Sequence, residues 1–77
     1  EVKFKSLLRL ERSMRIAGHR TSLALEQEFW LGLEKIARAR SSSLPVLIAA
    51  IDETRARETP EASLASAVRV FVLENRV

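Results

Sequence analysis

The chain has 77 residues, no cysteine, one histidine and a net charge of +3. This length allows one domain at most, and the lack of cysteine excludes disulfides and thiolate metal sites. Because 47% of the residues are hydrophobic, oligomerisation is the remaining way for so small a domain to bury them well.

The positive charge is concentrated in the first twenty residues, and the other fifty-seven are slightly acidic. This asymmetry is typical of an arm that faces a polyanion, although it also fits a solvated basic tail. We expect a basic arm over residues 1–12. Lys3, Lys5 and, just beyond the arm, Arg15 are expected to contact phosphates.

The apolar side chains of residues 1–12 alternate as in a strand, but some of them also recur at helical spacing. Both structures stay open for this segment. Its apolar residues are Val2, Phe4, Leu7, Leu8 and Leu10.

Residues 13–25 have an extended bias that Gly18 interrupts. A turn or bulge at Ala17–Gly18 would place Met14 and Ile16 on the same face as Leu23 and Leu25. We favour this break over an uninterrupted strand.

The segment 20–25 then runs directly into a helix. One strand cannot form a sheet alone, and the simplest partner is an identical strand from a second copy. We therefore predict a homodimer with a two-stranded ribbon, which is a shape that fits the DNA major groove.

Residues 26–40 are predicted to form an amphipathic helix. Its acidic residues come first and its basic residues last, as the helix dipole favours. Trp30 is expected to pack in the core rather than to stack on bases, and Gly32 marks either a close helix approach or nothing. The apolar stripe is Phe29, Leu33, Ile36 and Ala37.

Ser41–Ser43 form the connection to a second helix that extends to about Glu58. Ser43 or Ser42 can cap this helix, and Pro45 is tolerated in its first turn. The amides at such a helix start also form a ready phosphate site. The buried stripe is Leu44, Leu47, Ile48 and Ile51.

Thr59–Pro60–Glu61 is a further helix-start signal. The apolar residues after it recur at helical spacing, and β-branched valines leave a strand as the alternative; we favour a helix. The residues concerned are Leu64, Ala67, Val68, Phe71 and Val72.

No enzymatic activity and no cofactor are expected. A nucleophilic site needs an adjacent base, and His19 is the single histidine. The longest apolar run, Val70–Leu73, is far short of the ~20 residues of a membrane span. No signal peptide is evident, so we expect a cytoplasmic protein; Glu1 is not an initiator residue, which fits a fragment.

Together these segments resemble the ribbon-helix-helix family of Arc/MetJ-type DNA-binding proteins. The general pattern covers residues 18–52 and consists of Arg20–Glu26, Phe29–Trp30, Leu33, Ile36–Ala37 and Leu47–Ile48. The runs Ala17–Ser22 and Ser66–Leu73 are similar to a narrower bacterial branch of this family. That narrower resemblance would extend over residues 13–75.

The resemblance implies an intertwined homodimer, mostly α with one short strand per chain, in which alternate strand residues enter the major groove. Those residues are Arg20, Ser22 and Ala24, with Leu23 and Leu25 inward. It also implies that the helix start at Ser43 and Leu44 grips a phosphate, with His19 as a further phosphate contact.

Three features depart from the family pattern. Ala24 offers no hydrogen bond but could touch a thymine methyl group. Pro45 removes one amide from the phosphate site, and the carboxylates of Glu26 and Glu28 would repel nearby DNA.

The sequence therefore predicts a basic arm (1–12), a ribbon-helix-helix core (13–58) and a C-terminal helical extension (59–77). The predicted function is sequence-specific binding of double-stranded DNA by a transcriptional regulator. The alternative is a protein-interaction module, like an antitoxin or a scaffold, that docks a protein partner through the C-terminal helix and binds DNA weakly or not at all.

Overall fold

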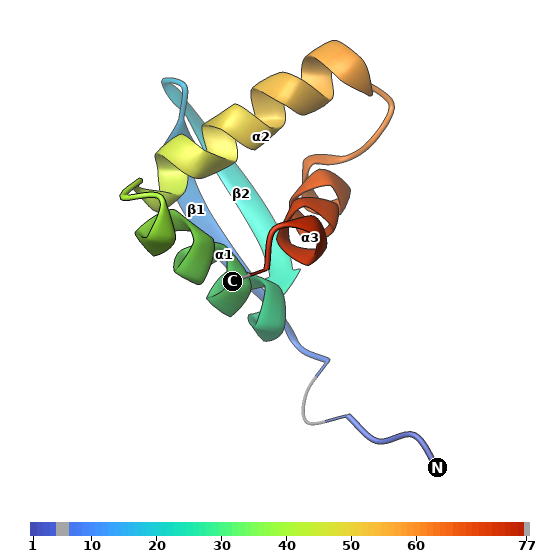
Figure 1. The fold of residues 1–77 in the computed structure, drawn as a ribbon. Coiled ribbons are helices and arrows are strands. Elements are labelled where there is room, and N and C mark those ends of the chain that lie inside the picture. The colour runs from blue at the N-terminus through green and yellow to red at the C-terminus, as the bar shows by residue number, and fades with distance from the viewer. Residues whose placement is uncertain (5–6, 77) are drawn as a thin grey trace.

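The chain folds into a two-stranded ribbon and three helices. The computed structural model describes residues 1–4 and 7–76. The elements are β1 (Arg9–Ile16), β2 (His19–Glu26), α1 (Gln27–Ala39), α2 (Leu44–Glu58) and α3 (Leu64–Glu74). The helices lie together over one side of the ribbon (Figure 1). This arrangement confirms the ribbon-helix-helix fold with an additional C-terminal helix.

Both strands of the ribbon belong to the same chain. This corrects the expectation of one strand per chain, because residues 9–16 form a strand that pairs antiparallel with residues 19–26. The predicted break at Ala17–Gly18 is confirmed as a two-residue turn, with φ of 51° at Ala17 and 83° at Gly18. Positive φ at both central positions gives the turn the twist of the flanking strands. The ribbon thus closes locally, and the dimer stays a prediction.

For residues 1–12 the sequence allowed either a strand or a helix, and the structure has a strand from Arg9 onward. The described residues before Arg9 form neither helix nor strand. The boundary predicted between arm and core therefore falls within β1, and the three-part division of the chain stays a prediction.

The two faces of the ribbon have the predicted phase. Ile16, Leu23 and Leu25 are buried, and Met14 is half-buried against them. The register places Met14 opposite Thr21 and Ile16 opposite His19. Directly opposed residues share a face, so one face of the ribbon closes on the helices.

The core lies between this face and the apolar stripes of the helices. Trp30 is 1% exposed, and its indole N–H donates to the Leu10 carbonyl oxygen at 2.8 Å. The predicted core position of Trp30 is confirmed, and its one polar atom is satisfied there. The buried helical residues are Trp30, Leu33, Ile36, Ala37, Leu47, Ile48, Ile51, Val68 and Val72.

Gly32 marks a close approach between α1 and α3. A Cβ atom at this position would lie 2.7 Å from Cγ1 of Val72, which is too close for two carbon atoms. The glycine lowers helix propensity by up to ~1 kcal/mol relative to alanine, and the close packing explains why it is tolerated.

Serine residues form hydrogen bonds at both ends of the connection between α1 and α2. Ser41 has a φ of 52°, and the Ser42 N–H donates to the Ala37 carbonyl at 2.9 Å, which satisfies a carbonyl at the end of α1. The Ser43 hydroxyl accepts from the Val46 N–H at 3.3 Å. The predicted cap of the second helix is therefore confirmed.

The third helix is confirmed as a helix, but it starts later than the Thr59–Pro60–Glu61 signal predicted. The N–H of Ala62 donates to the Thr59 carbonyl, so these residues form a turn. Arg55 holds that turn by donating to the Ala62 carbonyl at 3.0 Å. The helix begins at Leu64, where the Ser63 hydroxyl caps it by accepting from the Ser66 N–H.

Candidate nucleic-acid interface

The outer face of the ribbon, opposite the face that packs in the core, is polar apart from Ala24. Its residues alternate with the buried ones along both strands. Their cross-strand pairs are Arg9 with Glu26, Glu11 with Ala24, Ser13 with Ser22, and Arg15 with Arg20.

The three residues predicted to read bases lie together on this face. Arg20, Ser22 and Ala24 occupy alternate positions of β2, while Leu23 and Leu25 point into the core. Arg20 and Ser22 are exposed, and Ala24 is half-buried. The structure thus presents them to the outside as the alternation predicted; their contacts with bases stay a prediction.

Near the turn of the hairpin, two arginines stand directly opposite each other. Arg15 and Arg20 form a cross-strand pair, and like charges in such a pair are destabilising. Among the described residues neither guanidinium forms an ion pair. Arg15 donates to the Gly18 carbonyl oxygen at 3.1 Å, which fixes its position without neutralising it. The pair is a local concentration of uncompensated positive charge.

The middle of the outer face is neutral or acidic. The Ser13 and Ser22 hydroxyl oxygens lie 3.0 Å apart, so each can still exchange hydrogen bonds with a ligand. The exposed Glu11 stands opposite Ala24. The ribbon therefore offers donors, acceptors and both signs of charge along one line.

Sequence reasoning missed Ser13, Glu11 and Arg9 as members of this face. The sequence prediction paired the second strand with its own copy. It therefore did not set Arg9, Glu11 or Ser13 opposite the second strand. The alternation along residues 10–16, mirrored by residues 19–25 around Ala17–Gly18, was the signal that could have found them.

At its far end the ribbon is tied to α3. Arg69 donates to Oε1 of Glu26 at 2.9 Å and to Oε2 at 3.4 Å. This hydrogen bond is the main reason that the pKa of Glu26 lies below its ordinary value of 4.5, and a hydrogen bond with the backbone of Glu26 adds to it. The Glu26 carboxylate, which we expected to repel DNA, therefore has its charge compensated by Arg69.

The residues predicted to bind phosphate lie on three different elements. His19 is exposed at the start of β2, Ser43 and Leu44 open α2, and Lys3 belongs to the N-terminal segment, 4.0 Å from Glu1. Lys5 lies outside the described residues. The Ser43 hydroxyl already accepts from the Val46 N–H, so a phosphate there would use backbone amides.

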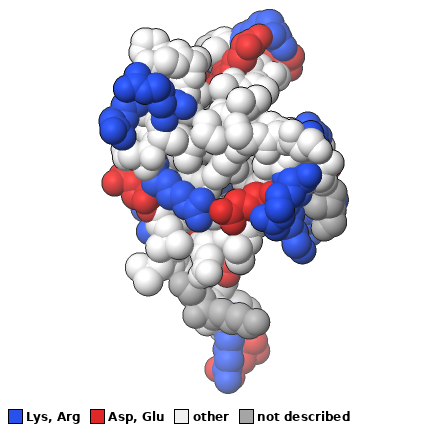
Figure 2. Space-filling view, turned by 90° about the vertical axis from the view of Figure 1, so that its left-hand side faces the viewer, with Lys and Arg blue, Asp and Glu red and all other residues white. Residues whose placement is uncertain are grey.

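Charge on the rest of the surface is mixed. On the face in Figure 2, Lys and Arg side chains alternate with Asp and Glu side chains in a band across the middle, and a further group of Lys or Arg side chains lies above the left end of this band. No helix among the described residues is long and apolar enough to cross a membrane. Within the same part of the chain, no group of three or more His, Asp or Glu residues is placed to hold a metal ion.

The comparison with protein families identifies the class of protein. Residues 2–75 match the family model described as a ribbon-helix-helix domain, and the chain belongs to this family. The comparisons with curated proteins and with solved structures gave no match.

Proposed function

We propose that this chain is a DNA-binding transcriptional regulator that places the outer face of its ribbon in the major groove, and that it acts as a homodimer. Ribbon-helix-helix domains commonly bind DNA as regulators or antitoxins. The observation that carries the proposal is the uncompensated pair of Arg15 and Arg20. A phosphate or a guanine edge would offset the repulsion that this pair adds to the folded chain.

The outer face supports distinct roles along the strands. The Arg20 guanidinium can donate to O6 and N7 of guanine, and the Ser22 hydroxyl can bond to either member of a base pair. Ala24 suits a thymine methyl group, and Glu11 across from it can accept from the amino group of cytosine. In this proposal Glu11 selects bases and weakens binding to phosphates.

Phosphate contacts in this proposal come from residues on several elements of the chain. Arg15 and His19 lie next to the turn of the hairpin, and the amides of Ser43 and Leu44 belong to the start of α2, where amides lack partners within the helix. Lys3 and Lys5 of the N-terminal segment add affinity that does not depend on sequence.

The proposal can be tested by titrating labelled duplexes with the wild type and with Arg20→Ala. A site selected from a random duplex library and a scrambled duplex serve as probes. Loss of a bidentate guanine contact should weaken the selected site by about 1–3 kcal/mol and spare the scrambled duplex. Lys3→Ala should weaken both duplexes alike, with a salt slope less steep by about 0.9.

Arg57→Ala is the matched control, because it removes the same charge from an exposed site at the end of α2. It should leave both affinities near the wild-type values. Absence of duplex binding at low salt contradicts the proposal. Equal weakening of both duplexes by Arg20→Ala makes Arg20 a phosphate contact instead.

A protein-interaction module remains the second candidate function. Its specific support is the exposed apolar surface of α3, where Val70 is 49% and Leu73 is 53% exposed. Absence of DNA binding together with a stable complex with another protein would favour this function.

A further inference from the structure

The outer face of the ribbon differs between its two ends. Next to the turn it carries two positive charges, and farther from the turn it carries a negative charge. Because both strands belong to one chain, this order of charges has no two-fold symmetry, and a single ribbon presents a direction to its ligand. The cross-strand pairs, in order from the turn, are Arg15 with Arg20, Ser13 with Ser22, and Glu11 with Ala24.

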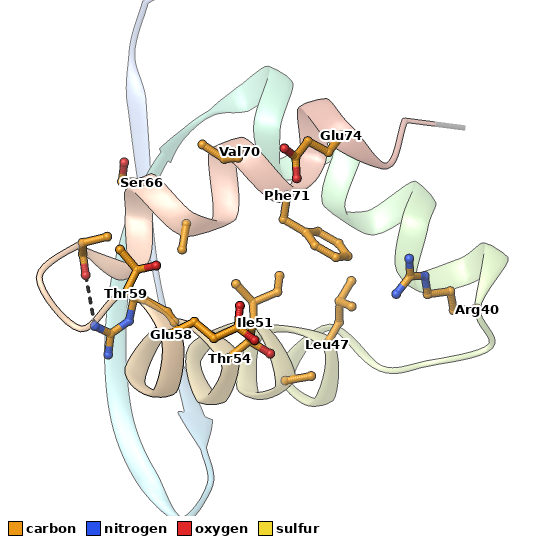
Figure 3. A pocket seen from close by; sticks show the side chains of 14 residues that line it. Arg40, Leu47, Ile51, Thr54, Glu58, Thr59, Ser66, Val70, Phe71 and Glu74 are labelled. Atoms are coloured by element: carbon orange, nitrogen blue, oxygen red, sulfur yellow. Dashed lines mark hydrogen bonds between the residues drawn. The ribbon is translucent and has the colours of Figure 1, made fainter.

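The carboxylate of Glu11 is uncompensated on this face. Glu11 is exposed, and none of the ion pairs among the described residues involves it. The side chain opposite it, that of Ala24, is a methyl group that offers neither a positive charge nor a hydrogen bond. The Glu11 carboxylate can therefore accept hydrogen bonds from a ligand. The groove between α2 and α3, into which Leu47, Ile51 and Phe71 point (Figure 3), belongs to the other side of the molecule's core and takes no part in this contact.

The residues on either side of Glu11 are attached to α1. The Leu10 carbonyl oxygen accepts from the Trp30 indole N–H at 2.8 Å. The Arg12 guanidinium lies 4.6 Å from the centre of the Trp30 ring and 3.2 Å from a carboxylate oxygen of Glu34. Since side chains alternate along a strand, these contacts hold residues 10 and 12 against the helix and direct Glu11 outward.

The distance between the two ends of this face can be expressed in base pairs. The major groove is about 12 Å wide, so it admits a two-stranded ribbon lengthwise. Residues rise by about 3.4 Å along an antiparallel strand, which places the Glu11–Ala24 pair about 14 Å from the Arg15–Arg20 pair. Base pairs follow one another every 3.4 Å or so along the duplex axis. Because the groove winds around that axis, this distance corresponds to about three or four base pairs.

A carboxylate in the major groove is selective among the bases. The phosphates on both sides of the groove repel it, and only hydrogen-bond donors on the base edges offset this repulsion. Cytosine presents an amino group with no acceptor on the same base, whereas the amino group of adenine lies next to the acceptor N7. Guanine and thymine present acceptors alone. The Glu11 carboxylate therefore favours cytosine over the other three bases.

We propose that Glu11 is a specificity-determining residue, and that one ribbon recognises an asymmetric DNA element. In this element a guanine bound by Arg20 and a cytosine bound by Glu11 lie about three or four base pairs apart. The inference rests on the proposed function and deepens it, because it names the class of DNA sequence that the outer face selects. It also separates the two strands: β2 supplies attraction near the turn, and β1 supplies rejection of sequences without the cytosine.

The spacing is tested by titrating the full chain against a series of labelled duplexes. Each duplex carries two G·C base pairs in an otherwise A·T sequence, with separations from two to six base pairs and with both orientations of the second pair. The wild type should bind most tightly at a separation of about three or four. At that separation, reversal of the second pair or its replacement by A·T should weaken binding about tenfold.

Glu11→Gln tests the residue itself. Glutamine has the same length without the charge, and it can bond to N6 and N7 of adenine. The variant should shift the preference at the second position from cytosine to adenine, and it should keep the preference for guanine at the first. Glu61→Gln is the matched control, because it removes the same charge from an exposed turn between α2 and α3. It should keep both preferences of the wild type, and circular dichroism establishes that each variant is folded.

Two results overturn this inference alone. If Glu11→Gln keeps the wild-type preference at the second position, Glu11 is a solvated surface charge and selects no base. If the wild type binds every separation equally, the two ends of the outer face do not act on one element. In both cases duplex binding itself persists, so the proposed function stands. Absence of binding to every duplex at low salt overturns the proposed function and this inference together.

Discussion

The sixteen strand residues form both faces of the ribbon, but the two faces have opposite effects on stability. The inner face buries Ile16, Leu23 and Leu25 against the helices. The outer face sets Arg15 against Arg20, which lowers stability. The difference shows that the inner face stabilises the fold, whereas the paired arginines of the outer face do not. In the function proposed above, the outer face binds DNA.

The largest expected effect is the difference in unfolding free energy between a substitution on the inner face and one on the outer face. Leu25 is 0% exposed, so Leu25→Ala should lower the free energy of unfolding by about 2–5 kcal/mol. Ser22→Ala, on the outer face, should change it by less than about 0.5 kcal/mol. Urea unfolding followed by Trp30 fluorescence at one protein concentration measures both. Similar losses in the two variants would contradict the assignment of the faces.

The turn that keeps the two strands in register should give the next largest effect. Gly18 has a φ of 83° with open space around it, so Gly18→Ala should cost about 1–2 kcal/mol from backbone strain alone. Ala17→Asn is the counterpart, since asparagine is favoured at this position of the turn. It should leave stability equal or raise it. A neutral Gly18→Ala variant would rule out this turn geometry.

On the outer face, a substitution that harms DNA binding should help folding. Arg20→Gln removes the like-charge contact with Arg15 and should raise the free energy of unfolding by about 0.2–1 kcal/mol. High salt should reduce this gain, because the repulsion between exposed charges is screened. Thermal melts at low and high salt test the prediction. A loss of stability would mean that Arg20 has a favourable contact within the fold.

The smallest effect concerns the end of the ribbon, where Glu26 meets Arg69. The pKa of Glu26 is lowered in the folded chain, so its stabilisation is present above the ordinary pKa of 4.5 and is lost as the pH falls through the lowered value. The difference in melting temperature between wild type and Glu26→Gln should therefore shrink with acidification below pH 4.5. A difference that is constant with pH would contradict the pairing.

The sequence by itself determined the local elements. Periodic apolar residues defined the helices, Ser43 marked a helix start, and the break at Ala17–Gly18 set the phase of Leu23 and Leu25. These features depend on neighbouring residues, whose spacing is visible in the chain. For the same reason the outward position of Arg20, Ser22 and Ala24 could be predicted, since side chains alternate along a strand.

Only the tertiary structure decided which strand completes the ribbon. Pairing with a second copy and pairing with residues 9–16 satisfy the same hydrogen bonds, and an Ala-Gly turn signals a hairpin less strongly than Asn-Gly does. Contacts between residues that are distant along the chain could not be predicted from the sequence either. Examples are the hydrogen bond between Glu26 and Arg69 and the packing of Gly32 against Val72. They depend on how the helices pack, and no local spacing encodes that packing.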